Sequence, residues 1–388
     1  MDVLYILSQS ESGLPHYTAQ LANAVAKEAN VTVLKPSETT ADDVFSDDVR
    51  TINAFQPMEL SLVELAQWNI SPKAVADGFL SYRNLTKVPD LDPDVVHTPT
   101  NLFPQVQLAA KWYGIGDSYP FIVTYHEVFP NKLLPDRPLP GIVHNWINRG
   151  LPSPAEEKTI VHTDAAKANL VERGRPSDDV HVISHPSYDM FDNAEMKTRE
   201  EKNTILYFGT IVPYKDIDLF TSAAVKAAQE INDLTAIIAG NGELPKASRK
   251  RIQNHPDLFE VRTEFVPNDE VGEYFERAQA LILPYLSREG QMGHSGVRTI
   301  GHSFGVPIIA TDVGEFKAQI ADSGSGLIVP EGDSAALASA IQRLLENDDE
   351  RESMAQQSQQ QSNEISWTEF ADRHLTIYEQ AIDSSDNR

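Results

Sequence analysis

The chain has 388 residues, a length that suits two domains of ordinary size. Hydrophobic residues make up 41% of it and charged residues 23%, a composition that supports buried cores and excludes disorder throughout. The formal net charge is −25, which argues against nucleic acid as a partner because an acidic surface repels a polyanion.

The acidic excess has two interpretations. It is compatible with ordinary solubility, and it is also typical of a protein from a halophile, because molar salt screens charges over about 3 Å. We favour the halophile. The chain has no Cys, which excludes disulfides and a thiol catalyst. The first residues lack the pattern of a signal peptide and no stretch is apolar enough to span a membrane, so we expect a cytoplasmic protein.

In the first half of the chain, β-branched runs alternate with amphipathic stretches. Strands are predicted at VLYIL, VTVL, VRTINAF, DVVHT, FIVTYH, TIVHT and VHVIS. Helices are predicted at residues 16–29, 73–85, 105–113 and 165–173. This rhythm indicates an α/β domain over residues 1–190, with a parallel sheet covered by helices on both faces. The Pro-rich segment 130–154 interrupts it and is expected to be irregular.

A polar stretch at 187–203 has the composition of a linker, and a second series of strands and helices follows it. The strands are predicted at TILYFGT, LTAIIAG, FEVRTEFV, ALILPY, PIIATD and GLIVP. The helices are predicted at 219–231, 246–252, 270–278, 297–304, 334–346 and 367–382. We therefore expect a second Rossmann-like domain over 200–366, with QQSQQQS as a helix end or connector.

Ligands of such sheets bind beyond the carboxyl ends of the strands, so two facing domains would form a cleft lined by the loops there. The first of these loops contains Gly13 at the start of a helix, where free N–H groups attract an anion or where the glycine simply forms a turn. The segment FGTIVPYKDIDLF places Lys215 between a strand and a helix, a position that suits a phosphate. A Gly-rich loop around GHSGV enters a helix near Ser295 and also favours an anion.

Three segments resemble glycosyltransferase family four, whose members are retaining, sugar-nucleotide-dependent enzymes of GT-B fold. They are GTIVPYKDIDLF, the donor-loop segment LPY…GHSGV…SFGVPIIATDVGEF, and the Trp-bearing SWTEFADRHLTIYEQAI. The resemblance implies two Rossmann-like domains, a C-terminal helix at 367–388 that packs on the N-terminal domain, and a nucleotide-sugar donor in the C-terminal domain. It implies transfer of a sugar to a glycan or lipid-linked acceptor without a metal or other cofactor.

The resemblance also assigns roles to single residues. Lys215 would meet the diphosphate, Gly13 would face the phosphates from the first loop, and His126 would lie near the reacting sugar. Phe265 and Val266 would hold the nucleobase. The remaining donor contacts would come from Thr210, Arg288, Gly293, His294, Ser295, Gly296 and Val297.

Two departures from the family pattern alter this expectation. The family commonly has two Glu eight positions apart across the donor loop, and the corresponding residues here are Met292 and Ile300. A basic residue often follows the glycine of the Lys segment, and here it is Thr210, so Arg288 or Arg298 would have to replace that charge. We expect altered donor contacts and retained activity. The alternative is a catalytically silent subunit that binds a sugar nucleotide or acts as a scaffold.

Other chemistries have weaker support. Asp90-Leu91-Asp92 resembles a metal motif, but its prolines favour a turn, and no zinc-binding spacing is present. GHSGV does not have the spacing of a hydrolase nucleophile. A GT-B epimerase would need acidic or histidine residues poised in the C-terminal half, and none is evident. The apolar residues of 130–154 either pack on their own domain or contact a lipid-linked acceptor or membrane surface.

Overall fold

The computed structural model describes residues 1–11, 13–57, 77–78, 80–100, 104–128, 156–188, 190–191, 200–287, 292–293 and 295–386. The chain forms two compact units. Unit 1 comprises Met1–His185 and Trp367–Arg388, and unit 2 comprises Pro186–Ser366. The division lies just before the expected linker. Segment 130–154 and part of helix 73–85 fall outside the described residues, so the expectations for them stay predictions.

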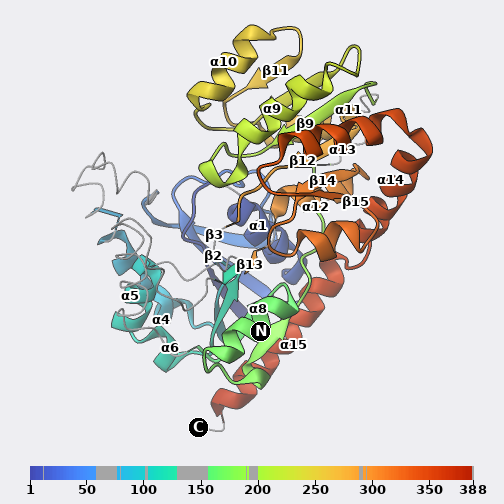
Figure 1. The fold of residues 1–388 in the computed structure, drawn as a ribbon. Coiled ribbons are helices and arrows are strands. Elements are labelled where there is room, and N and C mark those ends of the chain that lie inside the picture. Colours follow the sequence, from blue (N-terminus) through green and yellow to red (C-terminus); the bar gives the residue numbers. More distant parts are fainter. Residues whose placement is uncertain are drawn as a thin grey trace. The chain divides into compact units, whose positions relative to one another are not determined.

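Unit 1 contains a parallel seven-stranded sheet in the order β3-β2-β1-β4-β5-β7-β8 (Figure 1). Its described strands are β1 (Asp2–Ile6), β2 (Asn30–Pro36), β3 (Val49–Phe55), β4 (Val95–Thr98), β5 (Phe121–Tyr125), β7 (Lys158–Val161) and β8 (Val180–Val182), with the short β6 (Glu127–Val128) after β5. Its described helices are α1 (Gly13–Val25), η1 (Tyr82–Lys87), α4 (Val88–Leu91), α5 (Pro104–Trp112), α6 (Ile115–Ser118), α8 (Asp164–Glu172), η2 (Ser177–Asp179) and α15 (Trp367–Asp386). Every residue of β4 is buried, as expected of a central parallel strand with both faces covered.

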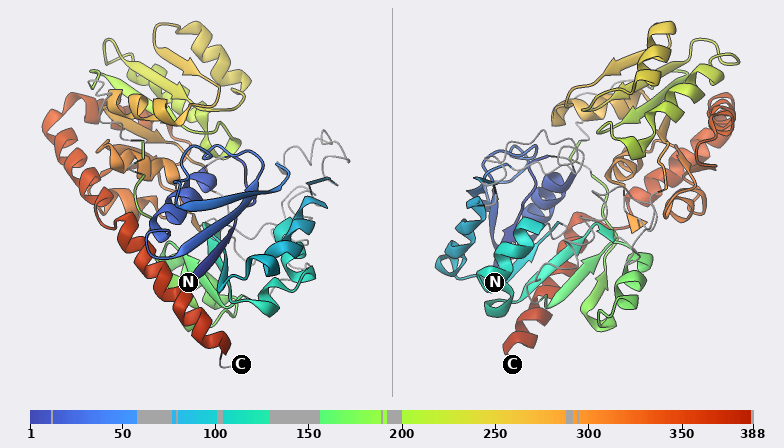
Figure 2. Two further views of the ribbon diagram at one scale, coloured as in Figure 1. Left: turned by 180° about the vertical axis from the view of Figure 1, so that it is seen from behind. Right: turned by 60° about the vertical axis from the view of Figure 1, so that its left-hand side comes forward.

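The C-terminal helix α15 belongs to unit 1, although it is far from the rest of that unit in sequence. It lies against α1 and β4, and Figures 1 and 2 show it running along the unit. Phe370 and Tyr378 of α15 are fully buried, and the Tyr378 hydroxyl lies 3.0 Å from that of Tyr5 in β1. Burial of large aromatic side chains supplies the main stabilisation of such a contact.

Unit 2 contains a parallel six-stranded sheet in the order β11-β10-β9-β12-β14-β15, with helices on both faces (Figure 2). Its described strands are β9 (Thr204–Phe208), β10 (Thr235–Ala239), β11 (Phe259–Arg262), β12 (Ala280–Leu283), β14 (Ile308–Thr311) and β15 (Gly326–Val329), with the short β13 (Met292–Gly293). Its described helices are η3 (Pro213–Lys215), α9 (Ile217–Ala227), α10 (Lys246–Asn254), η4 (Asn268–Glu270), α11 (Val271–Arg277), α12 (Gly296–Ser303), η5 (Lys317–Ala321), α13 (Ser334–Glu346) and α14 (Asp348–Ser362).

Helix α14 confirms one of the two alternatives expected for QQSQQQS, a helix end. These residues form the end of a 15-residue helix that the sequence did not predict, because α14 has no apolar stripe. Its attachment is polar: the hydroxyl of the buried Ser358 donates to the carbonyl of Val306. Asn347 caps its first turn by accepting from the N–H of Glu350.

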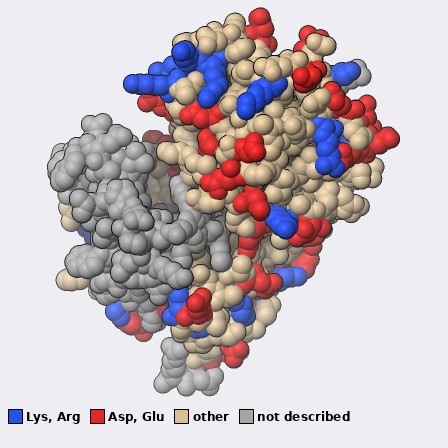
Figure 3. All heavy atoms as spheres, viewed as in Figure 1, with Lys and Arg blue, Asp and Glu red and all other residues tan. Residues whose placement is uncertain are grey.

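The surface of unit 2 reflects the acidic composition. On the face seen in Figure 3, Asp and Glu are spread widely, whereas Lys and Arg gather over α10, whose sequence is KASRKRIQN. No helix among the described residues is long and apolar enough to cross a membrane.

Candidate functional site

The loop that follows β9 carries Lys215 back over the carboxyl edge of the unit 2 sheet. Gly209 begins this loop with φ of +97°, a conformation that favours glycine. The backbone then enters η3, whose last residue is Lys215, and Asp216 caps α9 by accepting from the N–H of Leu219 at 3.1 Å. Lys215 is therefore fixed between a strand and a capped helix.

This loop packs tightly on the loop after β10. The N–H of Gly209 donates to the carbonyl of Ala239 at 2.9 Å, and that of Ile211 donates to Asn241 at 2.7 Å. A Cβ atom at Gly240 would lie only 2.2 Å from the carbonyl oxygen of Gly209, and Gly240 has φ of +147°. The close approach of the two loops thus requires glycine at position 240.

The ammonium group of Lys215 is buried and has no carboxylate partner among the residues that the structure describes. Lys215 is 8% exposed, and no Asp or Glu oxygen of the described residues lies within ion-pairing distance of its Nζ. Burial lowers the pKa of Lys215 to about 8, so the group still carries its charge at neutral pH. A buried cation without a protein anion is suited to binding an anionic ligand.

Helix α12 brings its N-terminus to the same place. Ser295 caps this helix by accepting from the N–H of Arg298 at 3.3 Å. The N–H groups of the first turn have no carbonyl partner within a helix and carry its partial positive charge. A Cβ atom at Gly209 would lie 3.0 Å from Lys215 Nζ and 3.2 Å from Val297 Cγ2. The lysine and the first turn of α12 therefore converge on Gly209.

Tyr285, just beyond β12, joins these two parts of the site. Its hydroxyl lies 3.2 Å from Ser295 Oγ, and its ring centroid lies 5.8 Å from Lys215 Nζ. Tyr285 was not among the predicted site residues, although LPY belongs to the donor-loop segment that resembles the family. Its position directly after a central strand, beside the Gly-rich loop, was the available signal.

The other predicted donor residues of unit 2 are placed as follows. Phe265 is 46% exposed, unusually much for an aromatic side chain, whereas Val266 is 5% exposed and packs inward. Thr210 is exposed in the loop next to Gly209. Gly293 lies in β13, and Arg288 and His294 lie outside the described residues.

Arg298, named as a substitute for the missing basic residue, points into unit 2. It is 8% exposed, and its Nη1 donates to Nδ1 of the buried His302 at 3.2 Å. Burial, and then Arg298, lower the pKa of His302 to about 2, so this histidine is neutral and can accept the bond. The guanidinium therefore stabilises the interior of α12 through His302.

The carboxyl edge of the unit 1 sheet carries a row of histidines. One histidine lies at or just beyond the end of each of the neighbouring strands β4, β5, β7 and β8, namely His97, His126, His162 and His185. The ring of Tyr17 from α1 lies 4.5 Å from that of His126, 5.6 Å from His162 and 5.1 Å from His185. Gly13 is the first residue of α1.

His126, the predicted catalytic residue, lies within this row. Its Nε2 donates to the carbonyl oxygen of Pro99 at 3.1 Å, because a carbonyl can only accept. Burial, and then His162, hold the pKa of His126 well below its usual value. The imidazole is therefore neutral at pH 7, which suits orienting a substrate and does not suit donating a proton as a strong acid.

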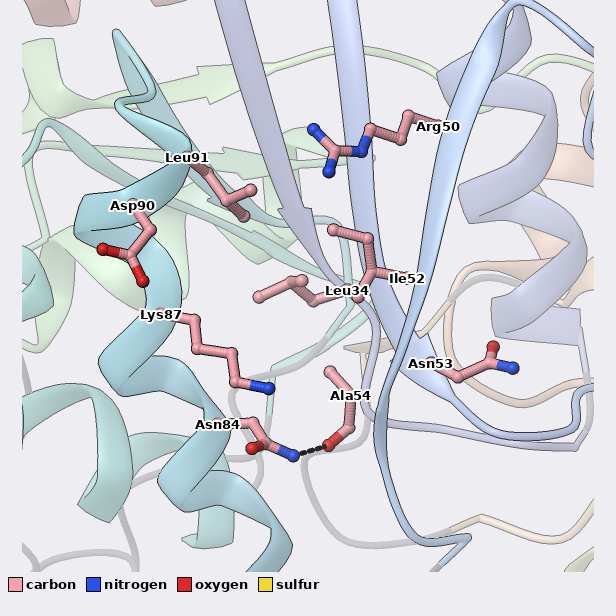
Figure 4. A pocket seen from close by; sticks show the side chains of 9 residues that line it. All are labelled: Leu34, Arg50, Ile52, Asn53, Ala54, Asn84, Lys87, Asp90 and Leu91. Atoms are coloured by element: carbon pink, nitrogen blue, oxygen red, sulfur yellow. Dashed lines mark hydrogen bonds between the residues drawn. The ribbon is translucent and has the colours of Figure 1, made fainter.

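A separate pocket of about 210 Å³ lies in unit 1 against β2 and β3 (Figure 4). Its floor includes Leu34 and Ile52, and Arg50 and Lys87 point into it from opposite sides. None of the predicted site residues that the structure describes lines it. Asp90-Leu91 of the motif considered for a metal lie at its rim, at the end of α4. In the described part of the chain no group of His, Cys, Asp and Glu is arranged to hold a metal ion.

Comparison with known families identifies both units. The model of glycosyltransferase family 4 matches residues 12–186, and that of glycosyl transferases group 1 matches residues 191–361. With two parallel Rossmann-like sheets, these matches define a GT-B protein of α/β class. The protein is a glycosyltransferase family 4-like protein.

Individual relatives are distant. The chain is 24% identical over 210 residues to alpha-D-kanosaminyltransferase of Streptomyces kanamyceticus, covering 51% of this chain and 53% of that protein. It is 23% identical over 296 residues to phosphatidyl-myo-inositol mannosyltransferase of Mycobacterium leprae, covering 75% and 74%. The chain thus spans only about half the length of the first of these relatives.

Solved structures share the fold along nearly the whole chain. Sucrose-phosphate synthase from Thermosynechococcus elongatus superposes with a TM-score of 0.69 at 16% identity, over 99% of this chain and 100% of that one. HepE of Anabaena in complex with UDP gives 0.64 at 13% identity over 100% of both chains. A putative UDP-N-acetylglucosamine 2-epimerase from Listeria monocytogenes gives 0.63 at 14%, over 99% and 97%. The fold alone therefore does not separate transfer from epimerisation.

Proposed function

We propose that this protein is a retaining glycosyltransferase that moves a sugar from a nucleoside diphosphate donor to a glycan or lipid-linked acceptor in the cytoplasm. The observation that carries the proposal is the convergence of the buried Lys215 ammonium and the α12 N-terminus on Gly209. The relatives named as kanosaminyl- and mannosyltransferases support transfer of a sugar, and the UDP complex of HepE supports a uridine nucleotide as a first probe.

The chemistry follows from the charges of this site. When the bond between the anomeric carbon and the donor phosphate breaks, negative charge develops on the leaving diphosphate and positive charge on the sugar. Lys215 and the first N–H groups of α12 stabilise the leaving group as its charge grows, which lowers the barrier to transfer. The leaving phosphate takes the acceptor's hydroxyl proton on the face that it vacates, so the configuration is retained and no additional base is needed.

Unit 1 would contribute the acceptor side. His126 is neutral, so we assign it the orientation of a sugar hydroxyl. Gly13 at the start of α1 would allow a phosphate or sugar to approach the backbone.

In unit 2, Phe265 would stack on the nucleobase of the donor through its exposed ring. No metal is required, because Lys215 and the helix N-terminus supply the positive charge.

The test is calorimetric titration and turnover with a panel of nucleotide sugars and nucleoside diphosphates, in high salt and with acceptors supplied. Lys215→Ala should weaken binding of a nucleoside diphosphate and lower kcat by about 10²–10³-fold, as loss of one oxyanion-stabilising donor does. The matched control is Lys226→Ala, because Lys226 lies on α9 and its Nζ donates to Ser334 at 2.7 Å. If Lys215→Ala binds the nucleotide with unchanged affinity, Lys215 does not contribute to nucleotide binding and its assignment is wrong.

A silent nucleotide-sugar-binding subunit is the second candidate. It is favoured by Met292 and Ile300 at the positions where the family commonly has Glu; Ile300 is 8% exposed and packs inside unit 2. Binding across the panel without transfer or donor hydrolysis would establish this candidate and overturn the transferase.

We also propose that the protein works in high salt. The net charge of −25 produces self-repulsion that salt screens. Thermal midpoints should therefore rise steadily from 0.1 M to molar KCl. If the thermal midpoint is constant or falls over that range, the proposal is wrong and the acidic excess serves solubility alone.

A further inference from the structure

We propose that Tyr285 is a positioning residue for the donor diphosphate, holding Ser295 at the start of α12 and the ammonium group of Lys215 in one arrangement. This inference rests on the proposed function, because it names how the same anion site is built. It concerns a residue that the sequence comparison with the family did not select.

The first contact is a hydrogen bond to the helix cap. The Tyr285 hydroxyl lies 3.2 Å from Ser295 Oγ, which also accepts from the N–H of Arg298. A serine hydroxyl has two lone pairs and one proton, so it can keep both of these contacts and still face a ligand. Tyr285 thereby fixes the position of Ser295, the N-cap residue of α12. The direction in which the first N–H groups of this helix point depends on that residue.

The second contact is between the ring and the cation. Lys215 Nζ lies 5.8 Å from the centroid of Tyr285, within the range in which a ring attracts a cation. An aromatic ring differs from a carboxylate in one respect that matters here. It orients the ammonium group without neutralising it, so the full positive charge stays available to a diphosphate.

Both the backbone and the ring of Tyr285 are held in place by neighbouring residues. The hydroxyl of Thr311 donates to the carbonyl of Tyr285 at 2.5 Å, and the ring centroid of Phe316 lies 5.3 Å away. The N–H of Leu286 donates to the carbonyl of Tyr214 at 2.7 Å, which ties the strand β12 loop to the Lys215 loop. A side chain anchored in this way can position its neighbours before the ligand arrives.

The two contacts make different predictions that conservative variants separate. Tyr285→Phe keeps the ring and removes the hydroxyl, so the Kd for UDP should rise about three- to tenfold with an unchanged pH dependence. Tyr285→Leu also removes the ring. Its Kd should rise tenfold or more, and the weakening of binding at high pH should begin about half a unit lower or more, because Lys215 loses a neighbour that stabilises its charged form.

The experiment is calorimetric titration of the full chain with UDP between pH 7 and 10 in constant high salt. In the wild type, binding should weaken above pH 8 as Lys215 loses its proton. Lys215→Arg should lack this weakening, since a guanidinium group stays charged. Tyr207→Phe is the matched control, because it removes a buried phenol oxygen in the same unit whose hydroxyl has no partner among the described residues.

A double-mutant cycle isolates the contact with Ser295. If the Tyr285 hydroxyl acts through that residue, Tyr285→Phe should have no further effect on the Kd in a Ser295→Ala background. Fully additive effects would overturn this part of the proposal. Thermal midpoints of all variants, measured alongside, identify any variant whose Kd reflects loss of folded protein.

The outcomes separate this inference from the proposed function. If the wild type binds none of the nucleoside diphosphates UDP, GDP and ADP, both are overturned. If the wild type binds and Lys215→Arg removes the pH dependence, but both Tyr285 variants match the Tyr207→Phe control, only the positioning role of Tyr285 is overturned.

Discussion

The two sheets have related parallel topologies, yet their carboxyl edges carry opposite chemistry. In unit 1 the edge bears His97, His126, His162 and His185, covered by aromatic rings of α1 and α15. In unit 2 it bears the buried Lys215 and the half-buried first turn of α12. His97, His126 and His162 of the first edge are neutral at pH 7, whereas Lys215 of the second is cationic.

Burial acts in the same direction on both edges, and the difference comes from the starting pKa values. Burial lowers the pKa of His162 to about 4 and that of Lys215 to about 8. A histidine that begins near 6.5 thus becomes neutral at pH 7, whereas a lysine that begins near 10.4 stays charged. Desolvation of both groups therefore leaves neutral imidazole at the edge of unit 1 and a charged ammonium group at the edge of unit 2.

The largest expected effect is acid unfolding of unit 1. Burial lowers the pKa of His374 to about 3 and, with His374 and His126 as further causes, holds that of His97 well below its usual value. Because these folded-state values lie below the unfolded value, only the unfolded chain takes up protons as the pH falls through 6.5. The free energy of unfolding therefore has its full value above pH 6.5. Below that pH it should fall by about 1.4 kcal/mol per pH unit for each such histidine.

Tryptophan fluorescence can follow this loss selectively, because the four Trp residues, at positions 68, 112, 146 and 367, all belong to unit 1. The denaturant concentration at the midpoint of the fluorescence transition should fall steeply between pH 6.5 and 5. In the control variant His374→Gln, which cannot titrate, the slope should be smaller by one histidine's share. A midpoint that does not change over this pH range would contradict the neutral state of His97 and His374.

The next effect concerns the loops of unit 2. Gly240→Ala would place a methyl group 2.2 Å from the carbonyl oxygen of Gly209 at φ of +147°, so the Lys215 loop must shift. We expect a loss of several kcal/mol in the stability of unit 2 and no measurable UDP binding. The control is Gly174→Ala in unit 1, at φ of +93° with nothing within 4 Å, which should cost only about 1–3 kcal/mol of backbone strain.

Circular dichroism and tryptophan fluorescence distinguish these two variants. Gly240→Ala should lower the midpoint of the unfolding transition that circular dichroism detects for unit 2. The midpoint of the fluorescence transition of unit 1 should not change. Equal effects of the two variants on UDP binding would show that the close approach of the loops does not build the anion site.

The sequence predicted the two edges better than it predicted what covers them. Lys215 and His126 follow from local patterns, because a strand followed by a polar loop places a residue at a known edge of the sheet. The burial of residues at these edges depends on long-range contacts such as that between His97 and Tyr378, which are 281 positions apart. Helix α14 escaped prediction for a related reason, since its attachment through Ser358 leaves no apolar period in the sequence.

The smallest expected effect tests the cover of the histidine row. The Tyr378 hydroxyl lies 2.7 Å from His97 Nδ1 and 3.0 Å from the Tyr5 hydroxyl, and all three groups are buried. Tyr378→Phe leaves His97 Nδ1 without this partner and should cost about 1–3 kcal/mol. Tyr5→Phe keeps the contact between His97 and Tyr378, so its cost should be smaller. Both losses should be visible in the fluorescence transition of unit 1, with UDP affinity unchanged. A UDP affinity that falls in either variant would mean that the neutral edge contributes directly to nucleotide binding, and the division of chemistry between the two edges would be wrong.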